Sequence, residues 1–119
     1  MKTFVKVKTQ FTGFHQWPDA PEEVSFLRNQ HRHVFHVYLT VKIDRDRGVE
    51  FFILQRQLIE CLDKILAWDY IQYEAILGST SCEEIAGEIL KYFNNVLGMP
   101  VHEVEVLEDN ENGSIVRMS

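Results

Sequence analysis

Residues 31–43 read HRHVFHVYLTVKI, and this stretch decides the fold. Its odd-numbered positions are apolar from Phe35 to Ile43, whereas most of its even-numbered positions carry polar side chains. An alternation with a period of two predicts a strand that buries one of its faces. Because His31 and His33 have the parity of the apolar positions, this strand directs two imidazoles toward its buried face.

A second alternating stretch lies at the N-terminal end. Residues 2–14 predict another half-buried strand, whose apolar face carries Val5, Val7 and Phe11. His15 has the same parity and ends this strand on its buried face. If the two strands pair antiparallel through the loop at residues 16–30, His15 comes close to His31 and His33. Within that loop, two prolines break the ladder, and a short helical turn is expected to open at Pro21.

Three imidazoles on one face at a strand end are the ligands of a zinc site that keeps its fourth position open. The alternative for any single histidine on an apolar face is a core side chain whose hydrogen bond is satisfied. An H-x-H pattern alone does not separate the two interpretations, and the parity of His15 favours the metal. His36 lies on the opposite face and His102 in a later strand, so both are expected to be surface or packing residues.

The C-terminal half predicts two helices followed by two strands. Apolar residues recur at helical spacing from about Glu50 to Ile65. A second helix starts at Ser81, which has capping-box spacing to Glu84, and stops before Gly98. Residues 69–78 are ambiguous, since they could continue a helix or form an ordered connection.

The last segment alternates again. Residues 101–107 predict a strand, Asn112-Gly113 predicts a tight turn, and Ile115 and Val116 can pair back. The element order β-β-α-α-β-β predicts an α+β fold, with an antiparallel four-stranded sheet and two helices on one face.

Composition limits the classes of function. The chain has 119 residues, which predicts a single domain over residues 1–119, and its net charge is −6, so the basic footprint of a nucleic-acid binder is missing. No apolar run approaches the roughly 20 residues of a membrane helix, and the alternating N-terminus does not read as a signal peptide. Cys61 and Cys82 lack the spacing of a metal-binding pair, which favours free thiols in a cytoplasmic protein.

Several motifs in this order resemble the family of 6-pyruvoyl-tetrahydropterin synthase and 6-carboxytetrahydropterin synthase, which has the tunnelling fold (T-fold). The resemblance covers residues 11–116 and combines degenerate motifs whose order and spacing are specific. The similar segments are Phe11-Thr12-Gly13-Phe14-His15, His31-Arg32-His33-Val34-Phe35 (the family's H-G-H-N-Y), Gly48-Val49-Glu50-Phe51, Ser81-Cys82-Glu83-Glu84-Ile85-Ala86 and Val104-Glu105-Val106-Leu107-Glu108.

The resemblance implies a zinc ion held by His15, His31 and His33, and a lyase-type enzyme. It implies a pterin-like substrate related to 7,8-dihydroneopterin triphosphate, bound between subunits and anchored by Glu108. Without the family, Glu108 reads as a solvated residue before a turn. The family also implies a homo-oligomer, a hexamer of two stacked trimers, and the open edges of a four-stranded sheet favour such an assembly.

The chain departs from the family's pattern at the proton relay. The family's catalytic cysteine has no counterpart between His15 and His31, and its Asp-His pair is matched by Asp69-Tyr70. Asp69 is the member of this pair that remains, and it is therefore a candidate catalytic residue. Cys82, in the first turn of the second helix, could substitute as a thiol whose pKa the helix dipole lowers, or be a small residue at a tolerant position.

Three functions follow from these motifs and departures. The first is a zinc-dependent enzyme with low synthase activity. The second is a non-catalytic protein of the same fold that binds a ligand or assembles. The third is a metal-binding β-barrel such as a cupin, which the two amphipathic helices disfavour. The proline-containing loop Trp17–Pro21 has no counterpart in the family's pattern.

Overall fold

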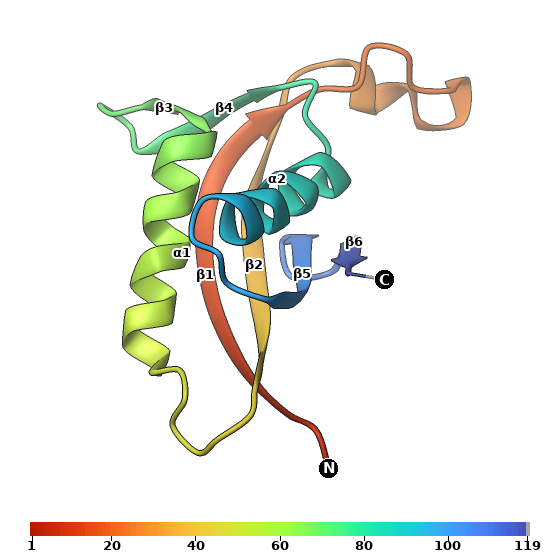
Figure 1. Ribbon diagram of the computed structural model, residues 1–119. Helices are drawn as coiled ribbons and strands as arrows, with labels where there is room; N and C mark the ends of the chain where they lie inside the picture. The colour runs from red at the N-terminus through yellow and green to blue at the C-terminus, as the bar shows by residue number, and fades with distance from the viewer. Residues whose placement is uncertain (119) are drawn as a thin grey trace.

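The centre of the molecule is a pair of long antiparallel strands, β1 (Thr3–His15) and β2 (His31–Ile43). A computed structural model describes residues 1–118 (Figure 1). Phe11 pairs with Phe35, and His15 pairs with His31 at the end of the ladder. The apolar parity of both strands faces the core, as predicted, and the most deeply buried positions of β2 are Phe35, Val37, Leu39 and Val41.

The sheet is larger than predicted. Within residues 1–118 it has six strands in the order β3-β4-β1-β2-β5-β6, where four were expected. The two additional strands, β3 (Ala67–Asp69) and β4 (Glu74–Gly78), form from the segment for which the sequence left helix or connection open. β4 pairs with β1 in parallel, so the sheet is not wholly antiparallel. Ala75 and Leu77 are buried while Ile76 is exposed, and this alternation places the segment in a sheet.

Two helices cover one face of the sheet, as predicted (Figure 1). They are α1 (Phe51–Ile65) and α2 (Cys82–Asn95). A 3-10 helix over Glu22–Arg28 belongs to the connection from β1 to β2. Glu50 caps α1 by accepting from Ile53 N, and Ser81 caps α2 by accepting from Glu84 N. Within residues 1–118, no helix has the length and apolar character needed to cross a membrane.

The turn between β5 (Val101–Glu108) and β6 (Asn112–Arg117) differs from the prediction. It is formed by Asp109 and Asn110, which have φ values of 53° and 59°, and not by Asn112-Gly113. Asp and Asn tolerate this left-handed backbone better than other side chains do. Gly113 pairs with Leu107 inside the ladder, where a Cβ atom would overlap the carbonyl of Val106. The glycine therefore permits a close approach of two strands.

Candidate metal centre

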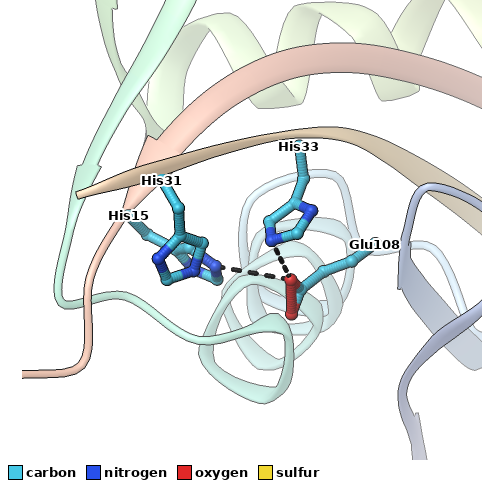
Figure 2. A group of neighbouring side chains, drawn as sticks. All are labelled: His15, His31, His33 and Glu108. Carbon is cyan, nitrogen blue, oxygen red and sulfur yellow. Dashed lines mark ion pairs between the residues drawn. The ribbon is translucent and has the colours of Figure 1, made fainter. Parts of the chain in front are cut away.

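The two central strands bring three histidines together at one end of the sheet (Figure 2). His15 and His31 are cross-strand partners, and His33 follows two positions later on the same face. The ring centroids lie 4.5 Å apart for His15 and His31, 5.1 Å for His31 and His33, and 5.6 Å for His15 and His33. The proximity inferred from strand parity is confirmed.

A carboxylate completes the group from the neighbouring strand. Glu108 is the last residue of β5 and pairs with Phe35 of β2. It follows Val104 and Val106, which are fully buried, so it ends an apolar row. Its Oε2 lies 2.7 Å from His33 Nε2 and 3.5 Å from His15 Nε2 (Figure 2). One possible ligand atom from each of the four residues lies within 4.8 Å of the others.

Each of the three imidazoles is oriented by a contact of its other nitrogen. The acceptor is Thr80 O for His15 (3.0 Å), Asn29 O for His31 (2.8 Å) and Asp109 Oδ2 for His33 (2.6 Å). A carbonyl or a carboxylate oxygen accepts and cannot donate, so these contacts assign the proton to Nδ1 in all three rings. The lone pair of a neutral ring is then on Nε2, which is free to bind a metal.

The contact between His33 and Glu108 indicates that a cation belongs between them. His33 Nε2 is buried and has no hydrogen-bond partner among the described residues, although Glu108 Oε2 is only 2.7 Å away. With the proton on Nδ1, two lone pairs face each other across this distance, which is unfavourable unless a positive charge separates them. A metal ion or an added proton would supply that charge.

The local electrostatics favour positive charge at this point. The pKa of His15 is raised above its ordinary value, first by the polar contact with Glu108 and against the opposing effect of burial. The pKa of Glu108 is lowered, first by the contact with His15, again against burial. The carboxylate of Glu108 therefore stays ionised and stabilises a positive charge on His15.

A cavity of about 330 Å³ adjoins three of the four residues. Its wall includes His15, His31 and Glu108, together with the indole of Trp17 and the first turn of α2. This volume is at the small end of the range of ligand pockets in proteins. The arrangement therefore places a potential metal centre next to a space of small-molecule size.

Asp69 and Cys82, the two catalytic candidates from the sequence, differ in their position relative to the cavity. The Asp69 carboxylate accepts from Ile71 N (3.0 Å) and Gln72 N (3.3 Å) in the turn after β3, and Asp69 is not among the described residues that line the cavity. Cys82 does line it, with its Sγ 3.9 Å from Glu108 Oε1. Burial, followed by the charge of Glu108, raises the pKa of Cys82 to about 12, so the lowered thiol pKa expected at a helix start is wrong.

Sequence reasoning missed the groups that orient the histidines. The acceptors at Asn29 and Thr80 are backbone carbonyls, which every residue has, so the residue types give no indication of them. Asp109 could have been suspected, since it directly follows Glu108 and a pair of adjacent acidic residues at a strand end is a common source of ligands and their supports. Its contact with His33 joins residues 76 positions apart, and only the strand pairing brings them together.

An α+β chain with this sheet and two helices on one face has the architecture of the T-fold. No protein-family model matches the sequence. No curated protein matches it either. Solved structures do match over essentially the whole chain, and they include 6-pyruvoyl tetrahydropterin synthase.

The synthase of Caenorhabditis elegans matches with a TM-score of 0.64 and 13% identity, covering 100% of this chain and 97% of that one. That of Plasmodium falciparum matches with a TM-score of 0.62 and 18% identity, covering 98% of each chain. An uncharacterized protein from Wolinella succinogenes matches with a TM-score of 0.69 and 15% identity, covering 100% and 99%. The chain thus has the fold of 6-pyruvoyl tetrahydropterin synthase, which confirms the resemblance in the sequence motifs at the level of the fold.

Proposed function

We propose that this protein is a zinc-binding member of the 6-pyruvoyl-tetrahydropterin synthase type that binds a pterin-like ligand related to dihydroneopterin triphosphate. The observation that carries the proposal is the orientation of the histidines. Three separate acceptors hold the three Nδ1–H groups and leave the Nε2 atoms facing one point beside a carboxylate. Core histidines with satisfied hydrogen bonds have no reason to converge in this way.

The donor set suits zinc. Imidazole nitrogens with a carboxylate nearby are ordinary zinc ligands, and three protein ligands leave one position for a substrate. Zinc bound here by His15, His31 and His33 would act as a Lewis acid toward oxygen atoms of a ligand in the adjoining cavity.

Glu108 is proposed as the residue that anchors the ligand. Its carboxylate lines the cavity, and its Oε1 lies on the side of Cys82, 3.9 Å from the Sγ atom. An ionised carboxylate accepts two parallel hydrogen bonds, and the amino and ring N–H groups of a pterin offer two adjacent donors. The lowered pKa of Glu108 keeps it in the accepting form.

A second candidate function is a protein of this fold that binds its ligand without efficient turnover. The observation that favours it concerns the two candidate bases among the described residues, Cys82 and Asp69. Cys82, the thiol in the cavity wall, has a pKa raised to about 12, and the carboxylate of Asp69 is engaged by two backbone N–H groups of its own turn. Asp69 as a catalytic residue therefore remains a proposal, since it is not among the described residues that line the cavity.

Assembly into a homo-oligomer, a hexamer of two trimers, is part of the proposal. The described sheet ends in β3 on one side and β6 on the other. Apolar side chains are exposed near both edges: Tyr70, Ile71 and Tyr73 beside β3, and Ile115 in β6. Unpaired edges with such side chains are normally covered by another chain. Light scattering should report a species well above the 14.0 kDa monomer, and a stable monomer at micromolar concentration would contradict this.

The test of the proposed function has two measurements on protein purified without a histidine tag. Elemental analysis should find about one zinc per chain. Calorimetric titration with a dihydropterin should show binding that is lost when the metal is removed by a chelator and restored by zinc. Protein that binds neither zinc nor the pterin would overturn the proposal, whereas zinc without pterin binding would limit it to the metal.

A further inference from the structure

The turn between β5 and β6 supports the metal centre from outside. Asp109 is the first residue of this turn and adopts a left-handed backbone with φ of 53°. Its backbone N–H donates to Val34 O at 2.7 Å, and its Oδ1 accepts from Val34 N–H at 3.0 Å. The side chain thus continues the β2–β5 pairing by one position beyond Glu108, and two hydrogen bonds hold the residue to β2.

The second carboxylate oxygen is directed at the metal centre. Asp109 Oδ2 accepts from His33 Nδ1–H at 2.6 Å, while Oδ1 is used by Val34. The two oxygens therefore have separate tasks, and the bond to Val34 fixes the direction of the bond to His33. The pKa of Asp109 is lowered, first by the hydrogen bond from the Val34 N–H and then by the one from His33.

Asp109 differs from the other two groups that orient the imidazoles. Thr80 and Asn29 offer neutral backbone carbonyls, whereas Asp109 offers a negative charge. A charge-assisted hydrogen bond is shorter and stronger than a neutral one, and it increases the electron density that the opposite ring nitrogen can give to a cation. His33 is also the ring whose Nε2 is buried without a hydrogen-bond partner among the described residues.

The next residue of the turn provides an internal comparison. Asn110 has a similar backbone, with φ of 59°, but its Oδ1 accepts from Tyr38 O–H at 2.7 Å on the other face of β2. Two adjacent turn residues with the same conformation thus hold opposite faces of one strand. A change at Asn110 disturbs the turn without removing a contact to His33.

We propose that Asp109 is a positioning residue that holds His33 as the Nδ1–H tautomer and thereby prepares its Nε2 for the metal. The inference rests on the proposed metal centre but concerns a residue outside the ligand set. It predicts that metal affinity depends on the charge and on the hydrogen-bonding pattern of a side chain that does not touch the ion.

The decisive variant is Asp109→Asn. Its single amide oxygen can still accept from Val34 N–H, but its amide NH₂ then faces His33 Nδ1 and favours the tautomer with the proton on Nε2. We expect zinc affinity to fall by roughly 10- to 100-fold, as for other residues that support metal ligands. Asp109→Gly, which keeps the left-handed turn, should lower the affinity in the same direction. Asn110→Gly is the matched control and should stay within about threefold of the wild type.

Two readouts separate positioning from folding. Competition with a chromophoric chelator measures zinc affinity, and thermal unfolding in chelator checks that the metal-free variants are folded. Long-range ¹⁵N–¹H correlation spectra of the metal-free protein, recorded where His33 is neutral, report the tautomer directly. The wild type should carry the His33 proton on Nδ1, and Asp109→Asn should carry it on Nε2.

The outcomes distinguish this inference from the proposed function. Wild-type affinity and an unchanged tautomer in Asp109→Asn would overturn the role of Asp109 while leaving the metal centre intact. An equal loss in Asn110→Gly would also overturn it, because the effect would then come from the turn. If the wild type takes up no zinc, the proposed function fails, and so does the predicted effect of Asp109 on zinc affinity. The tautomer of His33 in the metal-free protein then tests the contact with Asp109 separately.

Discussion

The two faces of strand β2 place a histidine in opposite electrostatic surroundings. His33 lies on the inner face, where Asp109 accepts from its Nδ1 and Glu108 faces its Nε2. His36, three residues later, lies on the outer face, and its Nδ1 has no hydrogen-bond partner among residues 1–118. The pKa of His36 is lowered, first by burial and then by the charge of Lys8.

The difference shows that the partners across the sheet decide what a histidine does. The inner face receives a carboxylate from β5 and a second one from the β5–β6 turn, so a cation is stabilised there. The outer face presents the lysine side chains of β1 near Tyr38, so positive charge is opposed there. Residue type and strand are the same on both faces, and only the environment differs.

The sharpest way to break this comparison is to remove one imidazole from each face. His33→Ala should strongly reduce the bound zinc, because the variant lacks one of the three proposed imidazole ligands. His36→Ala should keep the wild-type zinc content. Elemental analysis of both variants, purified side by side, measures the difference. Full zinc content in His33→Ala would remove the inner face from the metal centre.

The second prediction concerns turnover at the inner face. Without a positioned general base, the rate of 6-pyruvoyl- or 6-carboxytetrahydropterin formation from dihydroneopterin triphosphate should be lower by roughly 10²- to 10⁴-fold than in a synthase with the complete relay. Product formation followed by mass spectrometry, with a synthase as the positive control, measures it. Turnover within tenfold of that control would contradict the prediction and direct mutagenesis to Asp69, Tyr70 and Cys82.

The third prediction tests Glu108 as the anchor. Glu108→Gln keeps the shape of the side chain but loses the charge, which should weaken pterin binding by roughly 1.5–3 kcal/mol, or about 10- to 150-fold in Kd. We expect zinc to be retained. Glu105→Gln, on the same strand with the opposite parity, is the matched control. Loss of zinc in Glu108→Gln would instead make this carboxylate a metal ligand.

The smallest expected effect is on the pH dependence of the stability of the metal-free protein. Protonation of His15 on the inner face stabilises the fold, whereas protonation of His36 on the outer face destabilises it. The folded pKa of His15 is raised above 6.5, so its contact with Glu108 stabilises the fold below pH 6.5 and is lost as the pH rises through that folded pKa. The folded pKa of Glu108 is lowered below 4.5, so its contribution is present above pH 4.5 and is lost as the pH falls through the folded value. The pair therefore contributes most between pH 4.5 and 6.5.

His36 acts in the opposite direction, because its lowered pKa makes the folded state bind fewer protons than the unfolded state below pH 6.5. Thermal unfolding in chelator, compared at about pH 5.5 and about pH 8, measures both effects. Glu108→Gln should lower the melting temperature more at the acidic pH, whereas His36→Ala should raise it relative to the wild type there. Equal shifts at both pH values would contradict the assignment.

Much of the candidate site could be predicted from local patterns. The parity of His31 and His33 follows from the geometry of any strand. An antiparallel pairing of the two strands through the loop at residues 16–30 then brings His15 near them, and the apolar faces restrict the register that sets His15 opposite His31. The start of α2 was readable because its cap is local: Ser81 and Glu84 have capping-box spacing, and the Ser81 side chain accepts from Glu84 N. For α1 the apolar spacing gave only the approximate start near Glu50. Glu108 was singled out by the resemblance to the family, since from the residues alone it reads as a solvated glutamate before a turn. Val104 and Val106, the preceding residues of the same parity, are buried.

Other features depended on contacts between distant segments. The β3–β4 pair was not predicted, because short strands such as Ala67–Asp69 acquire their hydrogen bonds only from their neighbours in the sheet. The β5–β6 turn was placed at Asn112-Gly113 because that dipeptide has the strongest local preference. The bonds from Asp109 to Val34 stabilise the earlier turn instead.

The sequence by itself therefore determined which side chains share a face: three histidines on the inner face of β1 and β2, and a glutamate at the end of an apolar row. Side-chain periodicity is a property of the backbone, and it needs no tertiary contact. Only the tertiary structure decided which groups those side chains contact and how they are protonated. It placed Thr80, Asn29 and Asp109 behind the imidazoles and Glu108 in front of them, and it raised the pKa of Cys82 by burying it beside that carboxylate. Protonation states and metal affinity depend on distances between groups far apart in the chain, and folding alone sets those distances.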